Sequence, residues 1–242
     1  MNMLKKKMVK IFNITKTFVV SLKYFQFREF FKYFSEWRNS LNKERNSLVD
    51  AMPWISFTVI NLLDKYLKPE MKVFEYGSGG STLYFAKRVA KVVSIEHNKN
   101  WFEKMNLYLQ ELKLQNIDYK LLEPETDLEF SKKNNSDPDD YISGDANSIG
   151  KNYENYVKSI DKYPDTFFDI VSVDGRARPS CCKRSLPKIK VGGYLVYDNV
   201  EISYYEDSIA LLKPSEWSVT RYYGLFPYIK HFSMTLLAKK IK

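Results

Sequence analysis

The feature that most constrains the fold is a short apolar strand that runs directly into a glycine turn. Residues 72–76 read KVFEY and are followed by Gly77-Ser78-Gly79-Gly80. From there the chain alternates between segments of helical period and short apolar runs. Four of those runs are predicted strands, at 92–96, 117–122, 168–174 and 194–198. Strands that alternate with helices predict a mostly parallel sheet with helices on both faces.

Two further strands are predicted at the end of the chain, at 217–222 and 232–238. Their connection is too short for a parallel crossover, so they should pair antiparallel. The expected fold is therefore α/β, a Rossmann-like doubly wound sheet of about seven strands with a C-terminal antiparallel strand. A helix broken near Pro53 should precede the sheet.

The 242 residues carry a net charge of +9, of which residues 1–45 carry +8. We therefore divide the chain into a basic amphipathic helical extension (1–45) and one domain (46–242). Five aromatic residues of the extension fall at helical spacing on one face: Phe27, Phe30, Phe31, Phe34 and Trp37. Such a face fits docking on the body, a homodimer contact, an anionic membrane surface or, less well, nucleic acid.

The sequence offers no convincing membrane span or cleaved signal peptide, and its two cysteines are adjacent at Cys181 and Cys182. Adjacent cysteines cannot form a disulfide framework, which favours a reducing compartment. We expect a cytoplasmic protein, with contact at the inner membrane face as an alternative.

Ligands of such a sheet bind beyond the carboxyl ends of the strands. Gly77 and Gly79 let the backbone approach a ligand closely. Glu96 ends the second strand, where an acid can accept from both hydroxyls of a ribose. A nicotinamide dinucleotide fits less well, because Thr82 stands at the third glycine position and Glu75 would lie close to a pyrophosphate. The pattern predicts a nucleoside-containing cofactor.

The segment Val73–Gly79 (VFEYGSG) resembles the first motif of class I S-adenosylmethionine-dependent methyltransferases, with Ser81 at the next glycine of the fuller motif. The resemblance covers about residues 50–242 and implies S-adenosylmethionine as cofactor. Glu96 would hold the ribose and His97 would lie near the adenine. The alternative for His97 is an ordinary histidine at a strand end, and Glu123 is a weaker candidate for the adenine side. The cofactor-binding residues it implies are Glu75, Tyr76, Gly77, Ser78, Gly79, Ser81, Glu96, His97 and Asp174.

Asp174 ends the fourth strand, and Asp198 and Asn199 end the fifth. Two carboxylates and an amide oxygen suit Mg²⁺ or another divalent cation. The trio resembles the metal site of catechol and caffeoyl-CoA O-methyltransferases, whose catalytic lysine is replaced by Ala177. Three roles stay open for these predicted catalytic residues: metal binding, acceptor positioning with general-base work, and structural capping.

Arg176 and Arg178 follow at the expected mouth of the cleft, where paired guanidinium groups favour an anionic acceptor. The alternative is a surface pair that bonds nearby carbonyls. The polar segment 123–150 is predicted to be a long loop, and with the helix that bears Tyr153 and Tyr156 it should cover the cleft. Tyr153 is included among the substrate-binding candidates.

These observations predict a methyltransferase that moves a methyl group from S-adenosylmethionine to a hydroxyl of a small-molecule or glycan-like acceptor, with a divalent metal as an optional aid. Two alternatives remain. One is an RNA or other nucleic-acid methyltransferase that uses the basic arm, although the nearly neutral body makes nucleic acid an unlikely partner. The other is a catalytically silent scaffold that docks on a membrane or a partner protein.

Overall fold

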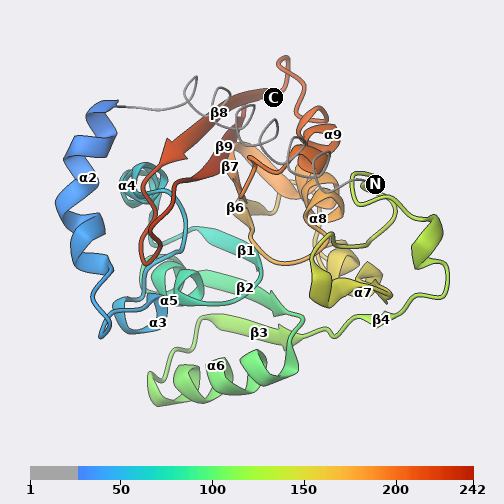
Figure 1. The fold of residues 1–242 in the computed structure, drawn as a ribbon, viewed down its shortest axis with the longest axis horizontal. Helices are drawn as coiled ribbons and strands as arrows, with labels where there is room; N and C mark the ends of the chain where they lie inside the picture. The colour runs from blue at the N-terminus through green and yellow to red at the C-terminus, as the bar shows by residue number, and fades with distance from the viewer. Residues whose placement is uncertain (1–26) are drawn as a thin grey trace, which may run out of the picture.

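The computed structural model describes residues 27–242, which form a seven-stranded sheet in the order β3-β2-β1-β6-β7-β9-β8. Neighbouring strands from β3 to β7 run parallel, and β9 is antiparallel to both β7 and β8. This confirms the predicted fold class (Figure 1). In spatial order the strands are β3 (Ile117–Leu121), β2 (Lys91–Glu96), β1 (Lys72–Tyr76), β6 (Phe168–Val173), β7 (Ile189–Asp198), β9 (Ser233–Lys240) and β8 (Trp217–Gly224).

The strand order reverses between β1 and β6. From β1 the chain builds outward through β2 to β3, then returns to place β6 on the other side of β1. Loops that leave two adjacent parallel strands in opposite directions open a crevice between them at the carboxyl ends. The β1–β6 boundary is therefore where a ligand site is expected.

Helices cover both faces of the sheet (Figure 1). Alternate strand residues serve the two layers: Phe74 and Tyr76 pack with α7 to α9, whereas Val73 packs with α4 and α5. This alternation follows from the period of two along a strand. The first layer contains α7 (Glu154–Lys158), α8 (Arg178–Ser185) and α9 (Glu206–Ile209), and the second contains α3 (Ser47–Asp50), α4 (Phe57–Tyr66), α5 (Gly80–Ala86) and α6 (Lys99–Glu111).

The start of β7 differs from the sequence-based expectation. The strand was expected at 194–198, but α8 ends at Ser185 and β7 already begins at Ile189. Residue 193 of this strand is a glycine because a Cβ there would stand 2.6 Å from the carbonyl oxygen of Asp169 on β6. Gly192 adopts φ +85°, in the stretch between Ile189 and Tyr194 where the register with β6 is irregular.

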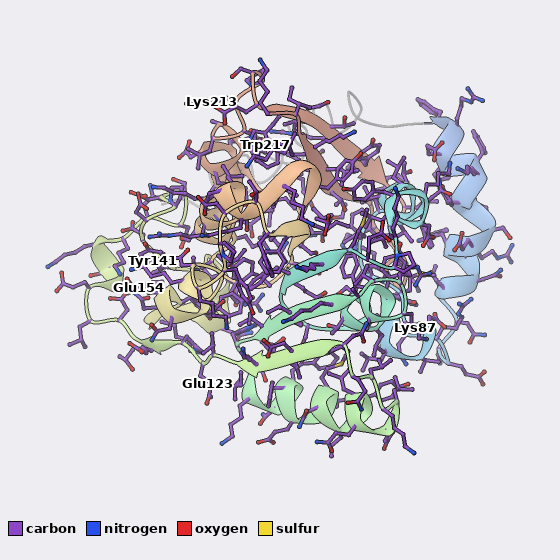
Figure 2. All side chains as sticks on the ribbon, turned by 180° about the vertical axis from the view of Figure 1, so that it is seen from behind. Lys87, Glu123, Tyr141, Glu154, Lys213 and Trp217 are labelled. Atoms are coloured by element: carbon purple, nitrogen blue, oxygen red, sulfur yellow. The ribbon has the colours of Figure 1, made fainter. Side chains whose placement is uncertain are left out.

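The segment predicted as a long loop contains a small two-stranded sheet. β4 (Glu125–Thr126) pairs antiparallel with β5 (Lys151–Asn152) and closes the segment at its base. Figure 2 shows Glu123 where the chain leaves β3 to enter this segment. The Lys133 ammonium also pairs with Asp127 at 2.8 Å inside it. The segment thus returns on itself instead of extending freely.

The helix α2 (Phe27–Ser40) packs against α4 and the β8–β9 connection, outside the sheet (Figure 1). The Tyr33 ring stacks on Phe57 with centroids 5.7 Å apart, and Trp37 Nε1 donates to the carbonyl of Ile229. The buried face is therefore not the expected one: Phe31 and Phe34 are exposed, and Tyr33 is buried in their place. Relative to the expected orientation, α2 turns a different side toward the body, because Tyr33 stacks on Phe57 of α4.

The predicted extension begins at residue 1, and its first 26 residues lie outside the described part of the chain. Among the helices described, none has the length and apolar character needed to cross a bilayer.

Candidate functional site

The glycine turn connects β1 to α5 at the carboxyl end of the sheet. Gly77 adopts φ +90°, and a Cβ there would stand 2.9 Å from both the nitrogen and the Cα of Gly175, at the end of β6. Only glycine fits both the conformation and the contact. At Gly79 a Cβ would meet nothing within 4 Å, so the turn faces open space at that residue. The turn thus presents bare backbone to a ligand.

Glu75 holds this turn from beneath. It is fully buried, and its Oε2 accepts hydrogen bonds from the hydroxyls of Thr82 (2.6 Å) and Ser94 (2.7 Å). The Thr82 hydroxyl in turn accepts from the N–H of Gly79 at 3.0 Å. Burial raises the pKa of Glu75 to about 7, against the lowering effect of the Ser81, Thr82 and Ser94 hydroxyls. Glu75 therefore supports the turn through Thr82 and does not itself reach the surface.

Glu96, at the end of β2, is 3% exposed and accepts hydrogen bonds from the chain on both oxygens. Oε2 accepts from the N–H and hydroxyl of Ser78, and Oε1 accepts from the N–H groups of His97 and Asn98. Burial raises its pKa, but these bonds and the His97 ring outweigh that effect and leave the pKa of Glu96 below its usual value. A ribose diol can bind this carboxylate once the Ser78 hydroxyl turns away.

A cavity of about 560 Å³ opens beyond β2 and β3. His97 and Glu123 line it from the ends of these strands, and Tyr153 and Arg176 line it from the opposite side. The His97 ring lies edge-on to Tyr153, with centroids 5.8 Å apart. The structure therefore brings both predicted adenine-side residues to one cavity, together with two residues predicted for substrate.

The segment 123–150 contributes to the same cavity. Asn147 and Ser148 line it, and the Ser148 hydroxyl lies 2.7 Å from that of Tyr153. Asp145 Oδ2 pairs with Arg176 Nε at 2.8 Å. The segment is thus fastened to the cavity wall by one ion pair and one hydroxyl contact.

A second cavity, of about 530 Å³, lies at the ends of β6 and β7. All three residues of the predicted metal-binding trio line it, and Trp54 and His231 line its outer part. Asp174 is 31% exposed at its side chain. Asp198 is buried, and its Oδ1 accepts from the Thr235 hydroxyl at 2.7 Å.

The charges of this trio are unequal. Burial and the neighbouring Asp174 carboxylate raise the pKa of Asp198 well above its usual range, although Arg178 and Thr235 act in the opposite direction. Arg178 donates to the Asp174 carboxylate but reaches Asp198 only at its backbone carbonyl. Burial raises the pKa of Asp174 as well, but the neighbouring Arg178 and Arg176 act against this, so Asp174 is the member of the pair that favours the charged form.

Arg178 lies inside the wall of the second cavity. It is 9% exposed, and its guanidinium donates to Asp174 Oδ1 and to the amide oxygen of Asn199, each at 2.9 Å. The side chain does not stand free for an anionic acceptor, and the alternative of bonding to nearby groups of the chain describes it better. The two oxygens that a metal would use are thus already paired with a cation, and these residues do not fit a divalent ion. Across residues 27–242, no cluster of three His, Cys, Asp or Glu side chains forms a metal site.

Of the predicted cofactor-binding residues, only His97 and Asp174 line one of these two cavities; the others, which lie in neither lining, are Glu75, Tyr76, Gly77, Ser78, Gly79, Ser81 and Glu96. The Tyr76 ring is fully buried under α7, where its hydroxyl donates to the carbonyl of Val157 at 2.6 Å. It can offer a ligand only its backbone. Ser81 is partly exposed in the first turn of α5, next to the glycine turn.

Several residues of the site carry no motif that the sequence analysis recognised. Trp101 donates from Nε1 to the carbonyl of Ser78 at 2.9 Å, and Tyr119 places its hydroxyl 2.7 Å from the Ser78 hydroxyl. Thr82 could have been found, since it stands three residues after Gly79 at a capping position. Trp54 and His231 could not, because they lie far from the motifs in sequence.

No protein-family model matches this sequence, and no curated protein matches it in sequence. Solved structures do match in fold. An O-methyltransferase from Bacillus cereus in complex with SAH is 13% identical, with 90% of this chain and 92% of that chain covered and a TM-score of 0.54. A methyltransferase from Geobacter sulfurreducens is 13% identical (87% and 97% covered, TM-score 0.53), and an rRNA methylase from Streptococcus thermophilus is 14% identical (76% and 95% covered, TM-score 0.53). The chain has the class I methyltransferase fold.

Proposed function

We propose that this protein is an S-adenosylmethionine-dependent methyltransferase that methylates a hydroxyl oxygen of a small-molecule or glycan-like acceptor. One observation carries the proposal. A glycine turn held by Glu75 and Glu96 packs through Gly77 against Gly175, and the 174–176 segment borders two cavities, with Arg176 on the first and Asp174 on the second. The SAH bound in the Bacillus cereus O-methyltransferase supports the cofactor.

The glycine turn, Glu96 and the first cavity together fit the cofactor. The open space at Gly79 leaves room for the methionine part, and Glu96 is an acceptor for the ribose. His97 and Glu123 would border the adenine. S-adenosylmethionine supplies an activated methyl group, so the protein has to align the acceptor and take up a proton.

Asp174 is our candidate for the proton acceptor. Its carboxylate is partly exposed in the second cavity, and its Oδ1 is oriented by Arg178. Asp198 is buried and favours its neutral form, which leaves Asp174 as the charged carboxylate next to an acceptor hydroxyl. A carboxylate within hydrogen-bonding reach of a hydroxyl can orient it and accept its proton as the methyl group is transferred.

Binding of the cofactor is the first test. Calorimetry with S-adenosylmethionine and SAH should give specific binding to the full chain, weakened about tenfold in Glu96→Gln by loss of one charge-assisted hydrogen bond. Glu111→Gln, an exposed position on α6, is the matched control and should bind normally. Absence of binding to the wild-type protein at about 1 mM ligand, or equal affinity in both variants, would contradict the proposed pocket.

Transfer is the second test. Release of SAH is measured over a panel of sugars, polyols and aromatic alcohols, and Asp174→Asn should retain cofactor binding while turnover falls about a hundredfold, the typical contribution of a general base. Full turnover in Asp174→Asn would remove it from the proposed mechanism.

An RNA acceptor is the second candidate, because the Streptococcus thermophilus structure is an rRNA methylase and residues 1–45 carry a charge of +8. Three acidic side chains line the second cavity: Asp174, Asp198 and Glu201. Asp174 is paired with Arg178, and Asp198 favours its neutral form. Glu201 is therefore the remaining carboxylate of this lining, which disfavours a phosphate backbone and favours an uncharged hydroxyl acceptor. Salt-dependent binding of structured RNA, with SAH released only when RNA is present, would establish the second candidate instead.

A further inference from the structure

The lining of the second cavity includes a cation of the protein itself, the guanidinium of Arg178. We propose that Arg178 is the resident cation of the Asp174–Asn199 site: its guanidinium stands where a divalent metal would bind, holds the two loops together and positions Asp174. The site would accordingly bind no divalent ion and need none.

The hydrogen bonds of Arg178 account for every N–H of its guanidinium. Nε donates to the carbonyl of Gly175 at 3.0 Å. Nη1 donates to the carbonyl of Asp198 (2.7 Å) and to the amide oxygen of Asn199 (2.9 Å). Nη2 donates to the carbonyl and to Oδ1 of Asp174, both at 2.9 Å. A guanidinium has five N–H donors, and these five bonds use all of them.

The acceptors are the groups that a hard cation would have required. Asp174 and Asn199 each accept from Arg178 with a side-chain oxygen. The Nδ2 of Asn199 donates to the Ser233 hydroxyl at 2.9 Å. Asp198 gives Arg178 only its backbone carbonyl, and its Oδ1 accepts from Thr235. A divalent ion at this position would have to displace a buried positive charge from its bonds, and it would be repelled by that charge.

The backbone on both sides is shaped around this side chain. Ala177 (φ 46°) and Asn199 (φ 55°) both adopt the left-handed conformation, which non-glycine residues rarely enter. Ala177 directly precedes α8, which begins at Arg178, and Asn199 directly follows β7. Strained conformations persist only where surrounding contacts impose them, and Arg178 bonds to the backbone or side chain of residues in both loops.

The position of Arg178 gives it a defined task in the proposed reaction. It fixes one oxygen of Asp174 and leaves the carboxylate partly exposed in the cavity. Arg178 is thus a positioning residue that acts through Asp174. This last step rests on the proposed methyl transfer, whereas the replacement of the metal by Arg178 does not.

Metal binding by the full chain tests the proposal directly. Mn²⁺ is titrated and followed by electron paramagnetic resonance for the wild type, Arg178→Ala, and the double variant Arg178→Ala with Asp174→Asn. The wild type should bind no Mn²⁺ at this site below about 1 mM, a weak limit for protein cation sites. Arg178→Ala should bind Mn²⁺ at least about tenfold more tightly than the wild type, and the double variant should lose that gain.

Arg176→Ala is the matched control, since Arg176 lines the other cavity and pairs with Asp145. It should leave Mn²⁺ binding as weak as in the wild type. Tight binding of one Mn²⁺ to the wild type, abolished by Asp174→Asn, would overturn the proposal. This outcome can be observed even if the Arg178 variants do not fold. The titration contains no cofactor, so it can be read even if the protein fails to bind S-adenosylmethionine.

A second readout concerns the positioning role. If the wild type turns over, a chelator should change its rate by less than about twofold, and Arg178→Lys should lower kcat more than the KM for the acceptor, because one ammonium cannot hold both loops. Loss of activity with chelator, restored by Mg²⁺, would refute the positioning role and the metal-free site together.

Discussion

Replacing Glu75 by Gln tests whether a buried charge lies beneath the glycine turn. The side chain is fully buried, and its Oε2 accepts hydrogen bonds from Thr82 and Ser94. Oε1 is buried without a hydrogen-bond partner. Gln keeps the shape of the side chain and removes the negative charge.

The magnitude follows from the pKa of Glu75, which burial raises from an ordinary 4.5 to about 7. A difference of that size corresponds to about 3 kcal/mol of unfolding free energy, at about 1.4 kcal/mol per pH unit. A carboxyl with a higher pKa in the folded chain binds its proton more tightly when folded. Its stabilising contribution is therefore complete below pH 4.5 and is lost as pH rises through about 7.

The assay is urea unfolding of the wild type and Glu75→Gln at pH 5 and pH 8. Relative to the wild type, the variant should gain up to about 3 kcal/mol between these two pH values. The new amide also places a buried NH₂ near the former Oε1, but that cost is independent of pH and cancels in the comparison. Glu70→Gln, at an exposed position before β1, is the control. A constant difference between wild type and Glu75→Gln across this range would refute the buried-charge argument.

Two further predictions concern packing. Gly175→Ala should destabilise the protein by about 1–3 kcal/mol through overpacking, since its Cβ would stand 2.0 Å from the Tyr156 hydroxyl. Adding Tyr156→Phe should recover part of that loss in chemical unfolding, and strict additivity of the two changes would contradict the contact. Trp37→Phe should cost about 1 kcal/mol by leaving the Ile229 carbonyl without its donor. Limited proteolysis should then cleave near α2 faster than in the wild type, and an unchanged rate would mean that this bond does not hold the helix.

The two cavities differ in charge in a way that suits the proposed reaction. Lys99, Lys151 and Arg176 line the first together with Glu123. Asp174, Asp198 and Glu201 line the second beside Arg178, and Asp198 favours its neutral form. A sulfonium at the boundary of the two carries a positive charge that nearby carboxylates stabilise. The expectation of an anionic acceptor, drawn from Arg176 and Arg178, stays a prediction.

The sequence predicted those elements correctly whose residues are adjacent in the chain and share one property, such as an apolar run or a glycine turn. The KVFEY strand, the following glycines and the acid that ends β2 were all found where expected. The start of β7 was misplaced at residue 194, because Gly192-Gly193 looks like a break before a strand. The carbonyl of Asp169 explains Gly193, and the positive φ of Gly192 explains the other glycine, and both are visible only in the structure.

The aromatic residues of α2 show the same limit. Their spacing correctly placed Phe30 and Trp37 on the docked side, but it also placed Phe31 and Phe34 there. Helical periodicity identifies a broad aromatic stripe, and the partner surface selects which part of it is covered. That partner, Phe57 on α4, cannot be inferred from the helix itself.

The sequence alone determined the order of strands and helices, the glycine turn and the acidic strand ends, because each depends on residues adjacent in the chain. The tertiary structure alone decided what those residues contact. It placed Arg178 between Asp174 and Asn199, where the sequence suggested a metal, and it enclosed Glu75 beneath the turn. The reason is physical: hydrogen bonding and burial depend on distances in space, and residues from β6, α8 and β7 become neighbours only when the sheet has formed.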